Sequence, residues 1–152
     1  MPLPQTEDKP STASALFREN VELVAAAILS GDPAQAHRAF FPLVGYQQVK
    51  AIKDPARDYE RRLLSAFDRD VREYHRALGN DPSGVTFAGI DVPEARAEWM
   101  KAGREGNKVG YYRVLRSKLR FTLASGKEKS FELTSLISWR GEWYVVHLNG
   151  FD

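Results

Sequence analysis

The amino-acid sequence predicts an α+β fold, with helices in the first half of the chain and an antiparallel sheet at its end. Apolar residues recur every three or four positions through the first half, as on one face of a helix. From Tyr111 onward apolar and polar residues alternate, and Gly126 and Gly141 stand where two hairpin turns would join three strands. The 152 residues suit one domain, which we expect over residues 12–152 after a flexible, proline-containing lead of residues 1–11.

The ends of the helices can be located from capping residues. Ser11 or Thr12 can cap a first helix that ends at Gly31, and Asp32-Pro33 can begin a short second helix. Asp54-Pro55 repeats this signal at the start of the clearest helix, which we expect to end at Gly79-Asn80. The apolar face of that helix consists of Tyr59, Leu63, Phe67, Val71, Tyr74 and Leu78.

The remaining segments before the sheet are shorter. Leu43–Ile52 fits either a short strand or an irregular turn, because so brief a segment has no decisive periodicity. Val85–Ile90 fits a strand, and Pro93–Ala102 fits a short helix. Gly103–Gly110 fits a flexible loop at the rim of the fold, with binding of an anion by its backbone N–H groups as the alternative.

The two hairpin turns predict a pairing register. A loop at residues 125–127 places Phe121 opposite Phe131 and Ser117 opposite Ser135. A two-residue turn at Arg140-Gly141 then pairs Ile137 with Tyr144. One face of the sheet then carries Leu119, Phe121, Phe131, Leu133, Ile137, Tyr144, Val146 and Leu148. The other face carries Arg116, Lys118, Arg120, Glu132, Thr134, Trp143, Val145 and His147.

Composition argues against several classes of function. The net charge is only +2, with 22 basic and 20 acidic residues interspersed, so we expect no binding to nucleic acid. The chain has no cysteine and its three histidines are far apart, so we expect no metal site and no cofactor. No apolar stretch approaches the roughly 20 residues of a membrane span. A cytoplasmic protein is the default expectation, and an exported protein whose signal has been removed is the alternative.

The order of elements resembles the cone-shaped α+β proteins of the ketosteroid-isomerase-like and nuclear-transport-factor-like (cystatin-like) superfamily. The resemblance implies a strongly curved antiparallel sheet wrapped around helices, with an apolar pocket at the open end of the cone. Members include isomerases, dehydratases, ligand-binding accessory domains and dimerisation modules, so the fold leaves the function open. The isomerase pattern places a tyrosine and carboxylates at a buried pocket, and the first helix here has no tyrosine.

Four residues are candidates for a ligand site: Ser117, Ser135, Trp139 and Tyr144. Two hydroxyl groups between rows of leucine and phenylalanine would leave room for a pocket, although small residues also suit a bend or bulge of a long strand. Asp70 lies between Phe67 and Tyr74 on the long helix and could act as a general base with Tyr74 as its partner. In the alternative interpretation, Asp70 pairs with a nearby arginine.

An apolar patch is expected on the second face of the sheet. It contains Trp143, Val145 and Leu136 and is bordered by Arg116 and Arg120. Such a patch suits a homodimer interface, unless the predicted helix at 93–102 covers it. The leading expectation is a non-enzymatic domain that binds a small apolar or amphipathic ligand or a protein partner. The alternatives are an isomerase- or dehydratase-like enzyme and a dimerisation module.

Overall fold

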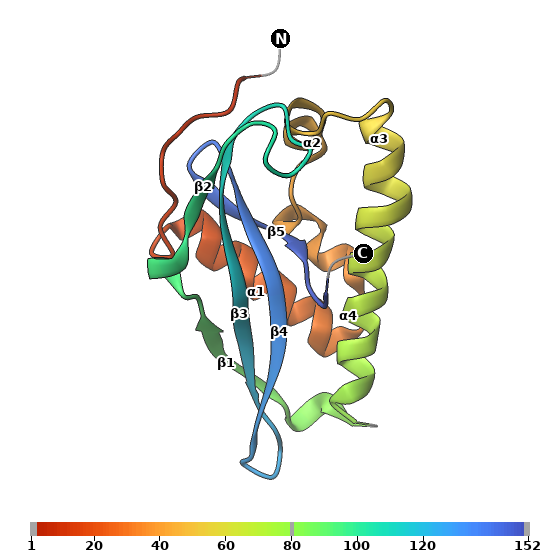
Figure 1. The fold of residues 1–152 in the computed structure, drawn as a ribbon. Coiled ribbons are helices and arrows are strands. Elements are labelled where there is room, and N and C mark those ends of the chain that lie inside the picture. The colour runs from red at the N-terminus through yellow and green to blue at the C-terminus, as the bar shows by residue number, and fades with distance from the viewer. Residues whose placement is uncertain (1–2, 80, 151–152) are drawn as a thin grey trace.

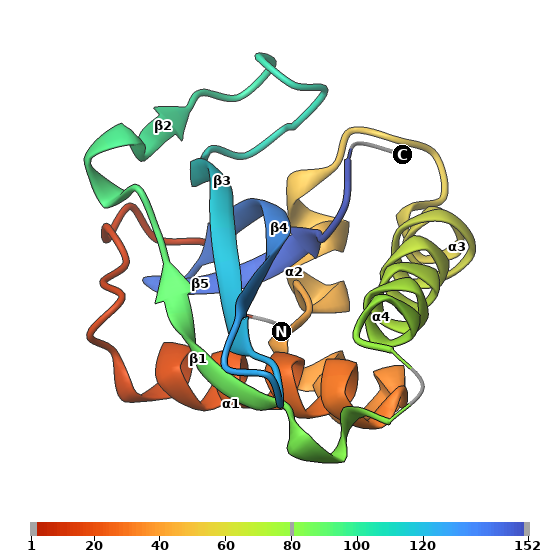
Figure 2. The same cartoon turned by 90° about the horizontal axis from the view of Figure 1, so that it is seen from below.

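The computed structural model describes residues 3–79 and 81–150. Its helices are α1 (Ala15–Ser30), α2 (Leu43–Val49), α3 (Pro55–Asp58) and α4 (Ser65–Ala77), and its strands are β1 (Thr86–Asp91), β2 (Glu98–Met100), β3 (Tyr111–Thr122), β4 (Glu128–Trp139) and β5 (Glu142–His147). Within the described residues, the antiparallel sheet curls into a half-barrel against the N-terminal helices (Figures 1 and 2). The α+β class is therefore confirmed, and the fold is cone-like as the resemblance implied.

The long hairpin of β3 and β4 forms the centre of the sheet (Figure 1). Strands β1, β3, β4 and β5 are hydrogen-bonded neighbours in that order, and β2 pairs with the other end of β3. Helix α1 lies across one side of the sheet, and α4 stands beside it along the edge of the half-barrel (Figure 2). One side of the curled sheet therefore packs against α1, and the ends of strands β3, β4 and β5 face α2.

Local capping chemistry sets most helix ends where the sequence predicts them. Gly31 ends α1 in the left-handed conformation, with φ of 77°, which glycine adopts without steric cost. The carboxylates of Asp32 and Asp54 accept hydrogen bonds from the backbone N–H groups of the turns that follow. The first cap is Ser14 rather than Ser11 or Thr12, because the Ser14 hydroxyl accepts from the N–H of the third helical residue.

The long helix is continuous but not uniform. A π-helical segment, Tyr59–Leu64, joins α3 to α4. The helix ends at Ala77, shortly before the predicted stop at Gly79-Asn80, of which Gly79 has a positive φ of 103° and Asn80 lies outside the described residues. The prediction of a short strand or an irregular turn at Leu43–Ile52 is wrong, because Leu43–Val49 forms helix α2. The helix predicted at Pro93–Ala102 is wrong, because this segment contains one short 3₁₀ turn followed by strand β2.

The predicted register of the first hairpin is wrong by two residues. Leu119 lies opposite Phe131, and Ser117 lies opposite Leu133 rather than Ser135. The loop closes one residue earlier than expected, because the N–H of Leu123 donates to the carbonyl oxygen of Lys127 at 2.8 Å. A shift of two residues keeps each side chain on the same face of the sheet. The error therefore changes which residues lie opposite one another, but not the face to which each side chain points. The predicted pairing of Ile137 with Tyr144 is confirmed.

A β-bulge changes the facing in the second half of the sheet. The register of β4 with β5 shifts between Ser135 and Leu136, and an extra residue in one strand reverses the alternation beyond it. Leu136, Trp143 and Val145 consequently turn toward α1 and are buried, with Trp143 only 1% exposed. The expected exposed patch is therefore wrong, and α1 rather than a helix at 93–102 covers these side chains.

The two arginines expected to border that patch lie on another part of the sheet. Arg116 has an exposed side chain and a left-handed backbone conformation, with φ of 66°, and it approaches Glu132 at 3.9 Å. Arg120 pairs with Asp91 at 2.9 Å and with Glu128 at 3.3 Å. Both arginines therefore serve ion pairs at the surface of the β1–β3–β4 region.

The described part of the segment before α1 is hydrogen-bonded to the sheet and to α2. The side-chain amide of Gln5 donates to the carbonyl oxygen of Ser138 at 2.9 Å and accepts from the N–H of Arg140 at 2.7 Å. Gln48 donates to the carbonyl oxygen of Leu3 at 2.8 Å. A proline-containing segment that was expected to be free is thus held against the β4–β5 turn.

Candidate functional site

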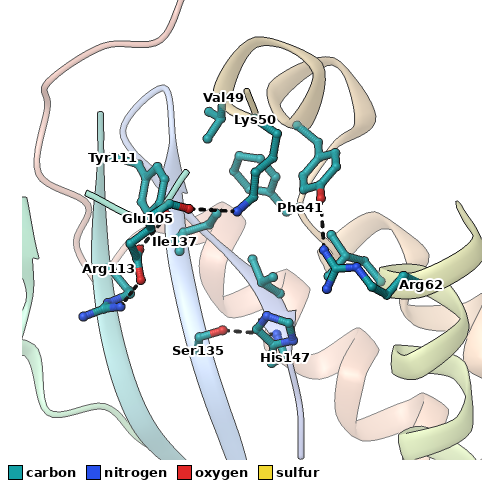
Figure 3. A pocket seen from close by; sticks show the side chains of 13 residues that line it. Phe41, Val49, Lys50, Arg62, Glu105, Tyr111, Arg113, Ser135, Ile137 and His147 are labelled. Atoms are coloured by element: carbon teal, nitrogen blue, oxygen red, sulfur yellow. Dashed lines mark hydrogen bonds and ion pairs between the residues drawn. The ribbon is translucent and has the colours of Figure 1, made fainter. Parts of the chain in front are cut away.

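A cavity of about 190 Å³ lies between α2, the π-helical segment and the ends of β3, β4 and β5 (Figure 3). Its apolar lining consists of Phe41, Val49, Leu63, Ile137 and Val146. Its polar lining consists of Tyr46, Lys50, Arg62, Glu105, Tyr111, Arg113, Ser135 and His147. Apolar side chains form the floor, and charged groups from the end of α2, the π-helical segment, the loop before β3 and β3 itself form the rim. Such an arrangement is typical of small-ligand sites.

The floor is fixed by the packing of Phe41. Its backbone N–H donates to the carbonyl oxygen of Val145 at 2.8 Å, which attaches the chain before α2 to strand β5. Its ring packs edge-on against Trp139 at 6.2 Å and against Tyr144 at 6.3 Å between centroids. Trp139 and Tyr144 therefore support the floor from behind and do not line the cavity.

One side of the rim is formed by Tyr46 and Arg62, and both bind Asp58, which lies just outside the lining residues. Arg62 donates two hydrogen bonds of 2.8 Å to the two carboxylate oxygens of Asp58, and the Tyr46 hydroxyl donates to the same carboxylate. The hydrogen bond from Arg62 lowers the pKa of Asp58, and burial, together with the neighbouring Asp58, raises the pKa of Tyr46. Asp58 is therefore a carboxylate, and Tyr46 a neutral phenol, at neutral pH.

The opposite side of the rim repeats this chemistry with Tyr111, Glu105 and Arg113. The Tyr111 hydroxyl donates to Glu105 Oε1 at 2.6 Å, and Arg113 donates to Glu105 Oε2. Arg113 also pairs with Glu98 of β2 at 3.1 Å. Burial raises the pKa of Tyr111, and the hydrogen bond to Glu105 raises it further. Asp58 and Glu105 are thus each held by one arginine and one phenol.

Glu105 is placed by a loop that a buried asparagine organises. Asn107 is 2% exposed, and its amide nitrogen lies 2.9, 3.1 and 3.3 Å from the carbonyl oxygens of Val109, Lys101 and Met100. Its amide oxygen accepts from the N–H of Glu105 at 2.9 Å. The loop predicted to be flexible, Gly103–Gly110, is therefore held in a defined shape by its own side chain.

The Gly103–Gly110 loop is hydrogen-bonded to the end of α2, where Lys50 lies at the mouth of the cavity. The N–H of Lys108 donates to the carbonyl oxygen of Val49 at 2.6 Å, and the N–H of Ala51 donates to that of Gly106 at 3.0 Å. The Lys50 ammonium reaches toward Glu105 and contacts its backbone oxygen at 3.4 Å (Figure 3). Within residues 3–79 and 81–150, no carboxylate forms an ion pair with Lys50.

The two serines of the predicted ligand site have different places. Ser135 lines the cavity at the bulge, and its hydroxyl oxygen accepts from the backbone N–H of His147 at 3.2 Å (Figure 3). Ser117 is fully buried and does not line the cavity, and its hydroxyl has no hydrogen-bond partner among the described residues. The expected pair of opposed hydroxyls is therefore wrong, and only Ser135 of the four predicted residues reaches the cavity.

Asp70 and Tyr74 lie outside the cavity. Asp70 is 4% exposed, accepts from the N–H of Asn149 at 3.3 Å and lies 3.6 Å from the guanidinium of Arg69. The Tyr74 hydroxyl donates to the carbonyl oxygen of Glu132 at 2.6 Å, and its ring stacks on Phe131. The structure thus gives Asp70 the arginine neighbour of the alternative interpretation, and it places both residues at the junction of α4 with the sheet.

Sequence reasoning missed most of the polar rim. Lys50 comes from a segment without clear periodicity, and Glu105 comes from a loop that was read as flexible. One signal was available, because Tyr111 and Arg113 are two residues apart on a strand and so share a face. A charged residue beside an aromatic one at the end of an otherwise apolar strand face indicates a polar site edge.

The described residues also form a second, more open surface feature. A shallow groove of about 630 Å³ runs between α1 and β1, lined in part by Phe17, Val21, Phe87 and Ile90. Among the described residues, no group of three or more potential metal ligands is found. None of the helices in this part of the chain combines the length and apolar character that crossing a bilayer requires.

Comparison of the chain with protein-family models, with curated proteins and with solved structures finds no match. The cavity is therefore the feature of this chain that points to a function.

Proposed function

We propose that this protein is a non-enzymatic domain that binds one small amphipathic ligand in the cavity between α2 and the sheet. The observation that carries the proposal is an apolar floor beneath a polar rim, where Glu105 and the nearby Asp58 are each already hydrogen-bonded to an arginine and a tyrosine. A cavity of about 150 Å³ in another protein accommodates benzene. The volume of about 190 Å³ therefore suits a ligand with one ring, or a short branched chain, and one polar group.

The engaged carboxylates favour binding over catalysis. A general base must be free to accept a proton from the substrate, with a pKa near the working pH. Asp58 receives hydrogen bonds from Arg62 and Tyr46, and its lowered pKa makes it a weaker base. The alternative enzyme would use Asp70, which lies outside the cavity. Replacing Asp70 by Asn should leave ligand affinity unchanged, and a loss of turnover found by screening would favour the enzyme instead.

We also propose that the chain is a divergent relative of the ketosteroid-isomerase-like and nuclear-transport-factor-like superfamily. The curled antiparallel sheet, the N-terminal helices and the cavity on the inside of the curl support this relation. Because that fold serves enzymes, binding domains and dimerisation modules alike, the relation adds nothing to the choice among them.

The first experiment is native mass spectrometry of the purified protein with a library of ring-sized acids, alcohols and amides. A one-to-one adduct is expected, and the same spectrum gives the number of subunits, which tests the homodimer expected from the sequence. Val146→Phe should abolish the adduct, because the new ring occupies the cavity. Val44→Phe is the matched control, since Val44 is exposed on α2.

The proposal fails if no compound of the library binds, or if Val146→Phe binds as well as the unmodified protein. Circular dichroism should establish that both variants are folded before their spectra are compared. Loss of binding in both variants would also count against the cavity, because Val44 does not line it.

A further inference from the structure

The charges around the cavity are unevenly paired. Arg62 is bound to Asp58, and Arg113 is bound to Glu105 and Glu98. Arg104 also lies 3.8 Å from Glu98, so three arginines face three carboxylates. These clusters place nearly balanced charge on the two sides of the rim. Lys50 adds a further cation between them. Among the described residues its ammonium donates a hydrogen bond only to the backbone oxygen of Glu105, at 3.4 Å, and its charge helps to lower the pKa of Asp58.

The Lys50 ammonium can donate more hydrogen bonds than the one it forms with Glu105. An ammonium carries three N–H donors and no acceptor, and the long contact to Glu105 uses one of them. The side chain is partly buried, so part of the water that normally surrounds an ammonium is displaced. An anionic group of a ligand would restore both the hydrogen bonds and the charge balance.

The position of Lys50 sets the orientation of the ligand. Figure 3 shows the side chain extending from the end of α2 toward the loop that carries Glu105, with Val49 and Ile137 close to it. An anion held by Lys50 Nζ would lie at the mouth, and the apolar part of the same molecule would lie on the floor. A ligand charged at one end and apolar at the other fits this arrangement.

The rim also limits the charge of the ligand. Glu105 lines the mouth beside Tyr111, and Asp58 lies next to Tyr46 and Arg62 just outside the lining residues. A doubly charged group, such as a phosphate monoester, would be repelled by Glu105 directly and by Asp58 from behind the lining, because like charges at short range repel. The hydroxyl protons of both tyrosines are already donated to these carboxylates, so the phenols offer an anion no further donor.

We propose that the ligand is a small monocarboxylate whose carboxylate binds the Lys50 ammonium and whose ring or branched chain lies on the apolar floor. This inference rests on the proposed function, because it names the class of ligand for the same cavity.

The test uses matched pairs of probes of nearly the same size and shape, in which a neutral amide replaces the charged carboxylate: benzoate with benzamide, and cyclohexanecarboxylate with cyclohexanecarboxamide. Affinities at neutral pH are measured by isothermal titration calorimetry. At least one carboxylate should bind about 10- to 100-fold more tightly than its amide, the range expected for a charge-assisted hydrogen bond. Lys50→Met removes the charge and keeps the apolar stem, so it should reduce this difference to less than about threefold. Lys53→Met is the matched control at a neighbouring exposed lysine.

The outcomes separate the two proposals. Equal binding of a carboxylate and its amide, or an unchanged carboxylate affinity in Lys50→Met, would overturn the monocarboxylate inference and leave the proposed function standing. Loss of both ligands in Lys50→Met would show that the lysine shapes the site and would also overturn it. If no probe binds the unmodified protein, the proposed function fails and the inference fails with it.

Discussion

Replacing Asn107 by alanine should destabilise the whole domain measurably. The side-chain amide contributes about three hydrogen bonds, because its two N–H groups are shared among the carbonyl oxygens of Met100, Lys101 and Val109 and its oxygen accepts from Glu105. Each such bond contributes about 0.5–1.5 kcal/mol net. Alanine also leaves buried partners without a bond, so we expect the free energy of unfolding to fall by about 2–4 kcal/mol.

Urea denaturation followed by tryptophan fluorescence measures this loss. A domain of this size is usually stable by about 5–15 kcal/mol, so the variant should remain folded in buffer and unfold at lower urea concentration with an unchanged slope. Asn149→Ala is the matched control, because Asn149 is exposed and its backbone N–H, which alanine keeps, donates to Asp70. This control should change stability by less than about 0.5 kcal/mol.

The reasoning would be refuted if Asn107→Ala cost no more than the Asn149 control. Such a result would mean that the loop keeps its shape without the asparagine, or that water replaces its bonds at no cost. Ligand affinity should fall together with stability, because the same amide positions Glu105 at the rim of the cavity.

Three further results are expected. The hydrogen bond from Arg62 lowers the folded-state pKa of Asp58, so Asp58 stabilises the fold above the unfolded pKa of about 3.9, and this contribution is lost as pH falls through the folded value. The stability difference between the unmodified protein and Asp58→Asn should therefore shrink from pH 7 to pH 3 in urea denaturation, and a constant difference would contradict this. Gly45→Ala should lower the free energy of unfolding by about 1–3 kcal/mol, because its methyl group would lie 2.9 Å from the ring of Trp139, and an unchanged melting temperature would contradict this. Gln5→Ala should speed cleavage of the lead in limited proteolysis, whereas an unchanged rate would show that the lead is held without it.

Features fixed by neighbouring residues could be predicted from the sequence, and those fixed by distant contacts could not. The turn at Gly31 and the caps at Asp32 and Asp54 depend on a few adjacent residues, and they are where the sequence placed them. The hairpin at Gly126 was also found, but its loop closes one residue earlier than expected, which moves the register by two. Several loop closures fit the same residues, so only packing of the whole sheet selects one.

The bulge at Ser135 is the main reason that the candidate site was only partly predicted. Nothing in the alternation shows where an extra residue is inserted, and the insertion moves Trp143 from an expected surface into the core. The rim depends on Lys50 and Glu105, which are 55 positions apart and come together only after the loop binds the end of α2. Tertiary contacts, and no local pattern, bring these two residues together.

The most direct test of the central claim is a methyl NMR titration of the unmodified protein with cyclohexanecarboxylate and with its amide. If the cavity binds ligand, at least one of these compounds should cause saturable shifts in the methyl signals of Val49, Ile137 and Val146. The signals of Val21 and Ile90, which line the groove between α1 and β1, should stay in place. Shifts confined to the groove, or no saturable shift with either compound, would contradict the account.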